Sequence, residues 1–241
     1  SAGTATGGEF QVNSYTSSFQ STAALGAGGD GSFGVAWGRR GAGEGDNSET
    51  SVHAQRFSAA GVAQGSEFQV NAYSTNYQWL PAVAVDGEGD FVVVWTSDGS
   101  NGTDDDSFSI QAERVEPAGA PLGDQFQVNT YTTGGQRIPA VAADGAGNFV
   151  VVWQSAAQDG SSYGVFGQRF SSAGSPLGSE FRANSFTVND QLDAAVAADG
   201  SGDFIVAWKS TDQDGSNYGV FGRRFNSAGV PQGSDFQVNS Y

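Results

Sequence analysis

The chain has 241 residues, 38% of them hydrophobic and 12% aromatic, so it can form one sizeable core. Its formal net charge of −16 excludes nucleic acid and anionic membrane surfaces as expected partners. It has no cysteine, which excludes disulfides and thiolate chemistry, and no apolar run approaches the ~18 residues of a membrane-spanning helix. The acidic, glycine-rich composition favours a secreted or cell-surface protein whose signal peptide is not part of this chain.

A phrase related to FQVN divides the chain into repeats. It begins at Phe10, Phe68, Phe126, Phe181 and Phe236, with spacings of 58, 58, 55 and 55 residues. Four tryptophans that end apolar runs keep the same step. We therefore expect a single domain over residues 1–241, with repeats at about 9–66, 67–124, 125–179 and 180–234 and a surplus strand at 235–241.

The third repeat shows the predicted elements in chain order. Residues 137–144 are a run of mostly small side chains that ends in a Gly/Asp turn. Residues 149–153, FVVVW, are typical of a strand buried on both faces. After a loop, residues 163–170 roughly alternate, and after a turn residues 180–184 alternate again. Each repeat thus predicts four strands, and no helical period is present.

Four-stranded repeats of this length are typical of a β-propeller, so the expected fold is all-β with four blades. The Ala-rich run is the predicted innermost strand, and FQVN the outermost. The repeated tryptophans are expected in the cores between blades rather than in a ligand site, at Trp37, Trp95, Trp153 and Trp208. Four blades need four outer strands and the chain has five FQVN phrases. We expect the N-terminal copy to close the ring in the last blade, and the other copy to be disordered or paired with a neighbouring molecule.

The phrases PAVAADGAGNFVVVWQS, QDGSSYGVFGQRF and GSEFRAN resemble uncharacterised repeats of large secreted bacterial proteins. Their blade pattern is also similar to that of sialidase-type (Asp-box) propellers. The resemblance covers essentially the whole chain and implies the fold. It does not carry an activity, because the Asp-box phrase S-x-D-x-G-x-T-W is absent. The arginines that a sialidase would cluster lie in different predicted elements, at Arg39, Arg40, Arg137, Arg182 and Arg223.

The loops of one predicted face differ between the repeats, whereas the turns of the other face are nearly constant: DGEGD, DGAGN and DGSGD. The constant turns indicate hairpin geometry rather than calcium sites. Variable loops on a constant scaffold are where binding usually evolves. We expect a carbohydrate to bind there through aromatic, amide and carboxylate side chains, namely Tyr77, Trp79, Gln158, Asp159, Tyr163, Gln213, Asp214 and Tyr218.

The expected function is a non-catalytic, lectin-like binding module rather than an enzyme. No Ser-His-Asp set or H-E-x-x-H motif can be assembled, since His53 is the only histidine, and no pair of glycosidase carboxylates stands out. The alternative is a structural or adhesive repeat domain, stabilised by calcium or by self-association. A glycosidase-like enzyme is the third and less favoured alternative. Calcium is the expected metal because hard oxygen ligands are abundant. Its candidate sites are the ring axis and the loop with Asp104, Asp105 and Asp106.

Overall fold

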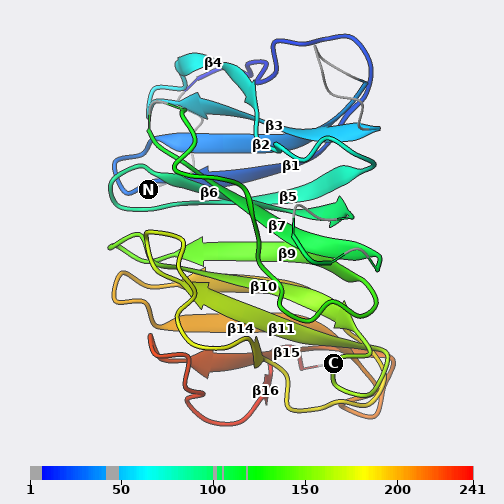
Figure 1. The fold of residues 1–241 in the computed structure, drawn as a ribbon. Coiled ribbons are helices and arrows are strands. Elements are labelled where there is room, and N and C mark those ends of the chain that lie inside the picture. Colours follow the sequence, from blue (N-terminus) through cyan, green and yellow to red (C-terminus); the bar gives the residue numbers. More distant parts are fainter. Residues whose placement is uncertain (1–6, 42–48, 100–101, 105, 118, 241) are drawn as a thin grey trace.

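The structure is a computed structural model that describes residues 7–41, 49–99, 102–104, 106–117 and 119–240. Its strands form four antiparallel sheets of four strands each (Figure 1). The predicted all-β, four-bladed propeller architecture is therefore confirmed. The described residues include no helix of the length and apolar character needed to cross a membrane.

Each blade takes its strands consecutively from the chain, beginning with the innermost one. Blade 1 contains β1 (Gln20–Ala27), β2 (Phe33–Arg40), β3 (Thr50–Phe57) and β4 (Ala63–Gln69). Blade 2 contains β5 (Gln78–Val85), β6 (Phe91–Asp98), β7 (Phe108–Val115) and β8 (Phe126–Gln127). Blade 3 contains β9 (Gln136–Ala143), β10 (Phe149–Ala156), β11 (Tyr163–Phe170) and β12 (Phe181–Arg182). Blade 4 contains β13 (Gln191–Ala198), β14 (Phe204–Thr211), β15 (Tyr218–Phe225) and β16 (Phe236–Gln237).

The constant turns between the first and second strands of blades 2, 3 and 4 are closed by an aspartate. Asp86 Oδ1 accepts the backbone N–H groups of Glu88 and Asp90, both at 2.9 Å. Asp144 and Asp199 repeat this bonding in the next two blades. The carboxylates thus satisfy turn amides that no strand partner reaches, which confirms that these residues are hairpin chemistry.

Among the described residues the hydrophobic core is divided into three clusters, each lying between consecutive blades. Trp95, Trp153 and Trp208 each belong to one cluster and are 0–1% exposed. Trp37, at 4% exposed, holds the same position in blade 1. The prediction of inter-blade core is confirmed for Trp95, Trp153 and Trp208. Trp37 is buried but belongs to none of these clusters, and it lines a cavity beside the N-terminal segment instead. The inner strands pack in the order β1, β5, β9 and β13.

The predicted closure of the ring by strands sharing a blade is wrong. The free edge of β15 is taken by β16, the next segment of the chain, with Phe221 opposite Gln237 and Gly222 opposite Phe236. The N-terminal copy, residues 9–13, forms no strand. No core cluster of the described residues joins blade 4 to blade 1, and these blades lie at opposite ends of the stack in Figure 1. β16 pairs with β15 in preference to residues 9–13 because it is closer along the chain, so the connecting loop costs less entropy to close.

Candidate functional site

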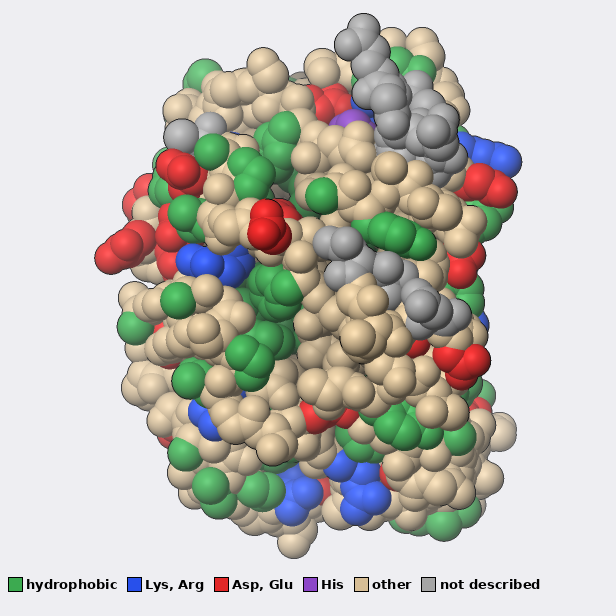
Figure 2. Space-filling model, viewed as in Figure 1, with side chains coloured by type: hydrophobic (Ala, Val, Ile, Leu, Met, Phe, Trp, Pro, Cys, Tyr) green, Lys and Arg blue, Asp and Glu red, His purple; other side chains and the backbone are tan. Residues whose placement is uncertain are grey.

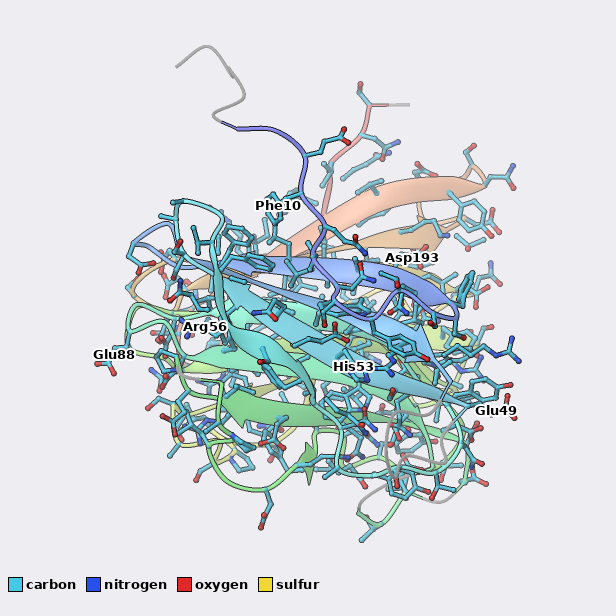
Figure 3. The ribbon with its side chains drawn as sticks, turned by 90° about the horizontal axis from the view of Figure 1, so that it is seen from above. Phe10, Glu49, His53, Arg56, Glu88 and Asp193 are labelled. Carbon is cyan, nitrogen blue, oxygen red and sulfur yellow. The ribbon has the colours of Figure 1, made fainter. Side chains whose placement is uncertain are left out.

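One face of the propeller carries the variable loops. The loop before each inner strand and the loop between the second and third strands meet there, because neighbouring strands are antiparallel. In Figure 3, Glu49 marks this loop face and Glu88 marks the turn face at the opposite end of the strands. On the side visible in Figure 2, acidic side chains are dispersed over the molecule rather than gathered in one patch. Charge alone therefore does not locate a site.

Three aromatic rings stack in a line at the loop face of blade 2, and we call them the aromatic row: Tyr77, Trp79 and Phe108. The ring centroids are 5.6 Å apart for Tyr77 and Trp79, and 5.7 Å apart for Trp79 and Phe108. The Arg137 guanidinium, at the start of β9 in blade 3, lies 3.9 Å from the Phe108 centroid. A hydrogen bond to Glu49 raises the pKa of the Tyr77 hydroxyl. The row is half-buried and presents apolar edges beside polar groups.

An ion pair occupies the corresponding place in blade 4. Lys209 Nζ lies 2.7 Å from Asp193 Oδ2 and 4.8 Å from the centroid of the Tyr218 ring. The lysine comes from β14 and the aspartate from the inner strand β13. The hydrogen bond that Lys209 donates to Asp193 raises the pKa of the Lys209 ammonium. The side chains of Lys209 and Asp193 are 36% and 54% exposed, so both groups are open to a ligand.

A bulge near the start of each inner strand sets the backbone at these positions. Leu80, Ile138 and Asp193 have φ of 51°, 53° and 53°, and Thr22 repeats this in blade 1 with φ of 49°. Positive φ is strained for such residues, at about 1–3 kcal/mol each. The Ile138 N–H donates to Thr96 Oγ1 of the preceding blade at 3.1 Å, which helps to hold the bulge. Bulges re-aim side chains, and Asp193 lies at such a bulge in β13.

The other predicted ligand residues fasten their own loops. Gln158 Nε2 donates to Glu180. Asp159 accepts the Ser161 N–H at 3.2 Å and Asn184 Nδ2 at 3.4 Å. In blade 4, Asp214 accepts the Ser216 N–H at 3.1 Å and Gln237 Nε2 at 2.9 Å. These carboxylates tie the outer strand to the loop beside it. Gln213 lies in the same loop, and Tyr163 begins β11 and is half-buried. Their role in ligand binding stays a prediction.

The predicted calcium loop does not form a cluster in the part of the chain that the structure describes. Asp104 is buried and accepts Asn129 Nδ2 at 2.7 Å, whereas Asp106 is exposed and accepts the Gly134 N–H at 2.9 Å. Asp105 lies outside the described residues. No group of three potential metal-ligating side chains occurs among the described residues. Calcium binding therefore stays a prediction from composition.

Sequence reasoning placed two members of the aromatic row, Tyr77 and Trp79, but missed Phe108, Asp193 and Lys209. A signal was present in the aligned repeats. The two positions that follow the constant glutamine read Ser-Thr, Trp-Leu, Arg-Ile and Leu-Asp in the four copies. A variable pair directly after an invariant residue on the innermost strand indicates a surface that differs between blades while the scaffold stays constant.

Comparison with solved structures identifies similar folds. A Hadza microbial sialidase superposes with a TM-score of 0.60 at 16% identity, over 92% of this chain and 47% of its own. The Penicillium chrysogenum alpha-L-arabinanase complexed with arabinobiose gives 0.60 at 11% identity, over 91% of this chain and 66% of its own. A GH43 protein from Bacillus licheniformis gives 0.52 at 11% identity, over 92% and 44%. This chain spans about half the length of the sialidase and the GH43 protein. No known protein family and no curated protein sequence matches the chain.

These comparisons correct the expected function. The similar solved structures are mainly glycoside hydrolases, which overturns the prediction of a non-catalytic, lectin-like module and the prediction that the protein is not an enzyme. The prediction of a non-catalytic module was wrong because it relied on a local motif, and the carboxylates of a propeller hydrolase need not form one. At 16% identity and below, the likeness establishes the fold of this chain.

Proposed function

We propose that the protein is a glycosidase-like propeller domain that cleaves a glycosidic bond at its loop face, next to Asp193. One observation carries the proposal. Asp193 is the single acidic residue on the four inner strands, which otherwise consist of apolar, small and uncharged polar residues and Arg137. It stands on a bulge, is exposed and lies 2.7 Å from an ammonium group. An exposed acid paired with an ammonium, on a set of strands that has no other acid, is a candidate functional residue.

The ammonium of Lys209 lies 2.7 Å from Asp193 Oδ2 and gives this carboxyl group a charged partner on the neighbouring strand. A carboxylate in this place stabilises the positive charge that develops on the sugar ring as the glycosidic bond breaks, or it attacks the anomeric carbon. Glycosidases need a second carboxyl group about 5–10 Å away, which protonates the leaving oxygen. The inner strands supply only one acid, so the second comes from a loop or from a neighbouring sheet.

The aromatic row supplies the binding surface for the rest of the glycan. Sugar rings have apolar faces that pack against aromatic side chains, and their hydroxyl groups bond to amides, carboxylates and arginine. A sialidase and an alpha-L-arabinanase complexed with arabinobiose share this fold, which supports a glycan as the substrate class. We place the protein outside the cell or at its surface, where such polymers are met.

Hydrolysis of sialyl-, arabino- and xylo-oligosaccharides tests the proposal. We expect turnover of at least one of them, and a loss of ~100-fold or more in kcat for Asp193→Asn, the usual cost of removing a catalytic carboxyl group. Lys209→Met should lower kcat less, because it removes the ammonium beside Asp193 and leaves the carboxyl group in place. Trp79→Ala should raise KM and leave kcat nearly unchanged.

The matched control is Asp199→Asn on the turn face of the same blade. Asp199 is exposed, and asparagine can keep its turn bonds to Ser201 and Asp203. Its activity should equal that of the unmodified protein. The proposal fails if no glycan is cleaved, or if Asp193→Asn and Asp199→Asn retain the same activity.

A further inference from the structure

The outer face of blade 4 exposes the residues that the other blades bury. Val220 is 40% exposed, whereas its counterpart Val165 in blade 3 is 0% exposed. Val238 is 58% exposed, whereas Ala183, in the same place of blade 3, is 0% exposed. Ile205 on the same face is 36% exposed. In blade 3 these positions pack against the next blade. The outer face of blade 4 therefore has the apolar residues of an inter-blade interface, but among the described residues no other blade packs against it.

Blade 1 exposes the complementary face. Leu25 on β1 is 64% exposed, whereas Val83, its counterpart on β5, is 9% exposed because blade 1 covers it. Phe33 and Val35 on β2 are half-buried, although their counterparts in the other three blades are buried. This is the face that blades 2, 3 and 4 each turn toward the preceding blade. In the described part of the chain, two blade faces thus pack against no other blade: the outer face of blade 4 and the complementary face of blade 1.

The N-terminal segment, residues 9–15, lies on blade 1 as the outer strand of a preceding blade would. The Phe10 ring centroid lies 5.3 Å from that of Phe57, and between blades 3 and 4 Phe181 lies 5.3 Å from Phe225. Both pairs of rings are tilted, by 54° and 50°. Figure 3 shows Phe10 reaching blade 1 from this segment.

The polar contacts of the N-terminal segment are repeated as well. The N–H and Oγ of Ser14 both donate to Glu67 Oε2, each at 2.8 Å. In blade 3, the N–H and Oγ of Ser185 donate to Asp235 Oδ2 of blade 4, at 2.8 and 2.7 Å. The segment therefore occupies, without a sheet of its own, the place of an outer strand from a missing blade.

This cover is incomplete. A mostly apolar cavity of about 340 Å³ remains between the segment and blade 1, lined in part by Val12, Ala23, Val35 and Trp37. Leu25 stays exposed because the segment brings no inner strand with it. The segment also shares its sequence with the end of blade 4: EFQVNSY at residues 9–15 and DFQVNSY at residues 235–241.

We propose that the outer face of blade 4 binds blade 1 of a second copy of this chain, displacing residues 9–15 of that copy. The interface continues the one already formed three times between consecutive blades. Phe236 and Ser240 of the first copy then take the places of Phe10 and Ser14, in the same sequence context. The contact is heterologous, so it forms a ring where the rotation closes and a longer assembly where it does not. Both are head-to-tail products of the same interface.

Sedimentation velocity over a range of protein concentrations tests this proposal on the full chain. We expect association that strengthens with concentration. Phe10→Asp removes the aromatic anchor of the covering segment and should shift the association midpoint to a concentration about tenfold lower, equivalent to ~1.4 kcal/mol. If the segment is instead required for the contact, Phe10→Asp will weaken association, and the proposed displacement is wrong.

Val220→Asp, placed in the Phe10→Asp background, should return the protein to a monomer. Val188→Asp is the control: Val188 is 56% exposed, and its counterparts Thr75 and Thr133 belong to no inter-blade cluster. Circular dichroism and melting curves establish that both variants remain folded. A protein that is monomeric at every concentration, or one in which the two aspartate variants associate equally, overturns the proposal.

Cross-linking gives a second measurement, because the chain has no cysteine of its own. Leu25→Cys and Ile205→Cys chains are prepared separately, mixed and treated with a short bismaleimide. We expect a covalent dimer from this mixture. A mixture of Leu25→Cys and Val188→Cys should give none. Equal yields from the two mixtures would mean random collision, and the head-to-tail contact would be rejected.

Discussion

Glu113 occupies a position that two other blades give to glutamine. Gln55 Nε2 donates to the carbonyls of Arg56 at 3.1 Å and Gly65 at 3.3 Å. Gln168 donates in the same way to Arg169 and Gly178. An ionised carboxylate cannot donate, and Glu113 is 4% exposed. Burial raises the pKa of Glu113 to about 7, and nearby Asp124 adds to the shift.

This shift predicts a pH-dependent loss of stability that Glu113→Gln should remove. The pKa of Glu113 is higher in the folded protein than in the unfolded chain, so the folded state retains the proton and loses stability as pH rises from about 4.5 to about 7. Urea unfolding should show the variant to be more stable at pH 8, by roughly 2 kcal/mol, and equal at pH 4. An identical difference at both pH values would assign the effect to packing instead.

At the scale of elements, burial in the strands predicts which tryptophan contributes more to the free energy of unfolding. Trp153 on β10 is 0% exposed and belongs to the core between blades 2 and 3. Trp153→Ala should lower the free energy of unfolding by roughly 3–5 kcal/mol. Trp79→Ala should lower the free energy of unfolding clearly less, because Trp79 is only half-buried, between Tyr77 and Phe108. Chemical denaturation of the two variants checks the order, and equal losses would contradict it.

The strands of this fold could be predicted from sequence because each repeat combines a buried apolar run with Gly/Asp turns. Which of the two terminal segments forms the outer strand of blade 4 could not be predicted. Residues 9–13 and 235–239 have nearly the same sequence, and only the neighbouring edge of β15 distinguishes them. The candidate site was also only partly predictable. Asp193 and Lys209 meet across the strand pair β13 and β14, where a bulge shifts the register by an amount that no local pattern encodes.

At the scale of the whole molecule, stability should vary along the row of blades. A repeat architecture gains its stability from interfaces between neighbours, so a blade packed on both faces opens less often than one packed on a single face. Blades 2 and 3 have two such interfaces, and blades 1 and 4 have one each. On β6 and β10 every residue but the last is buried, whereas β14 alternates between buried and accessible positions.

Native-state hydrogen exchange should therefore show the slowest amides on β6 and β10 and faster exchange on β14. The measurement is made at a concentration low enough to keep the protein monomeric. Raising the concentration should then slow exchange on β14 toward the rate of β10, because a second copy covers the outer face of blade 4. The turns of blade 4 that face solvent in both states serve as the internal reference. Uniform exchange across all four blades at low concentration would mean that the blades unfold as one unit, and the ranking by interfaces would be wrong.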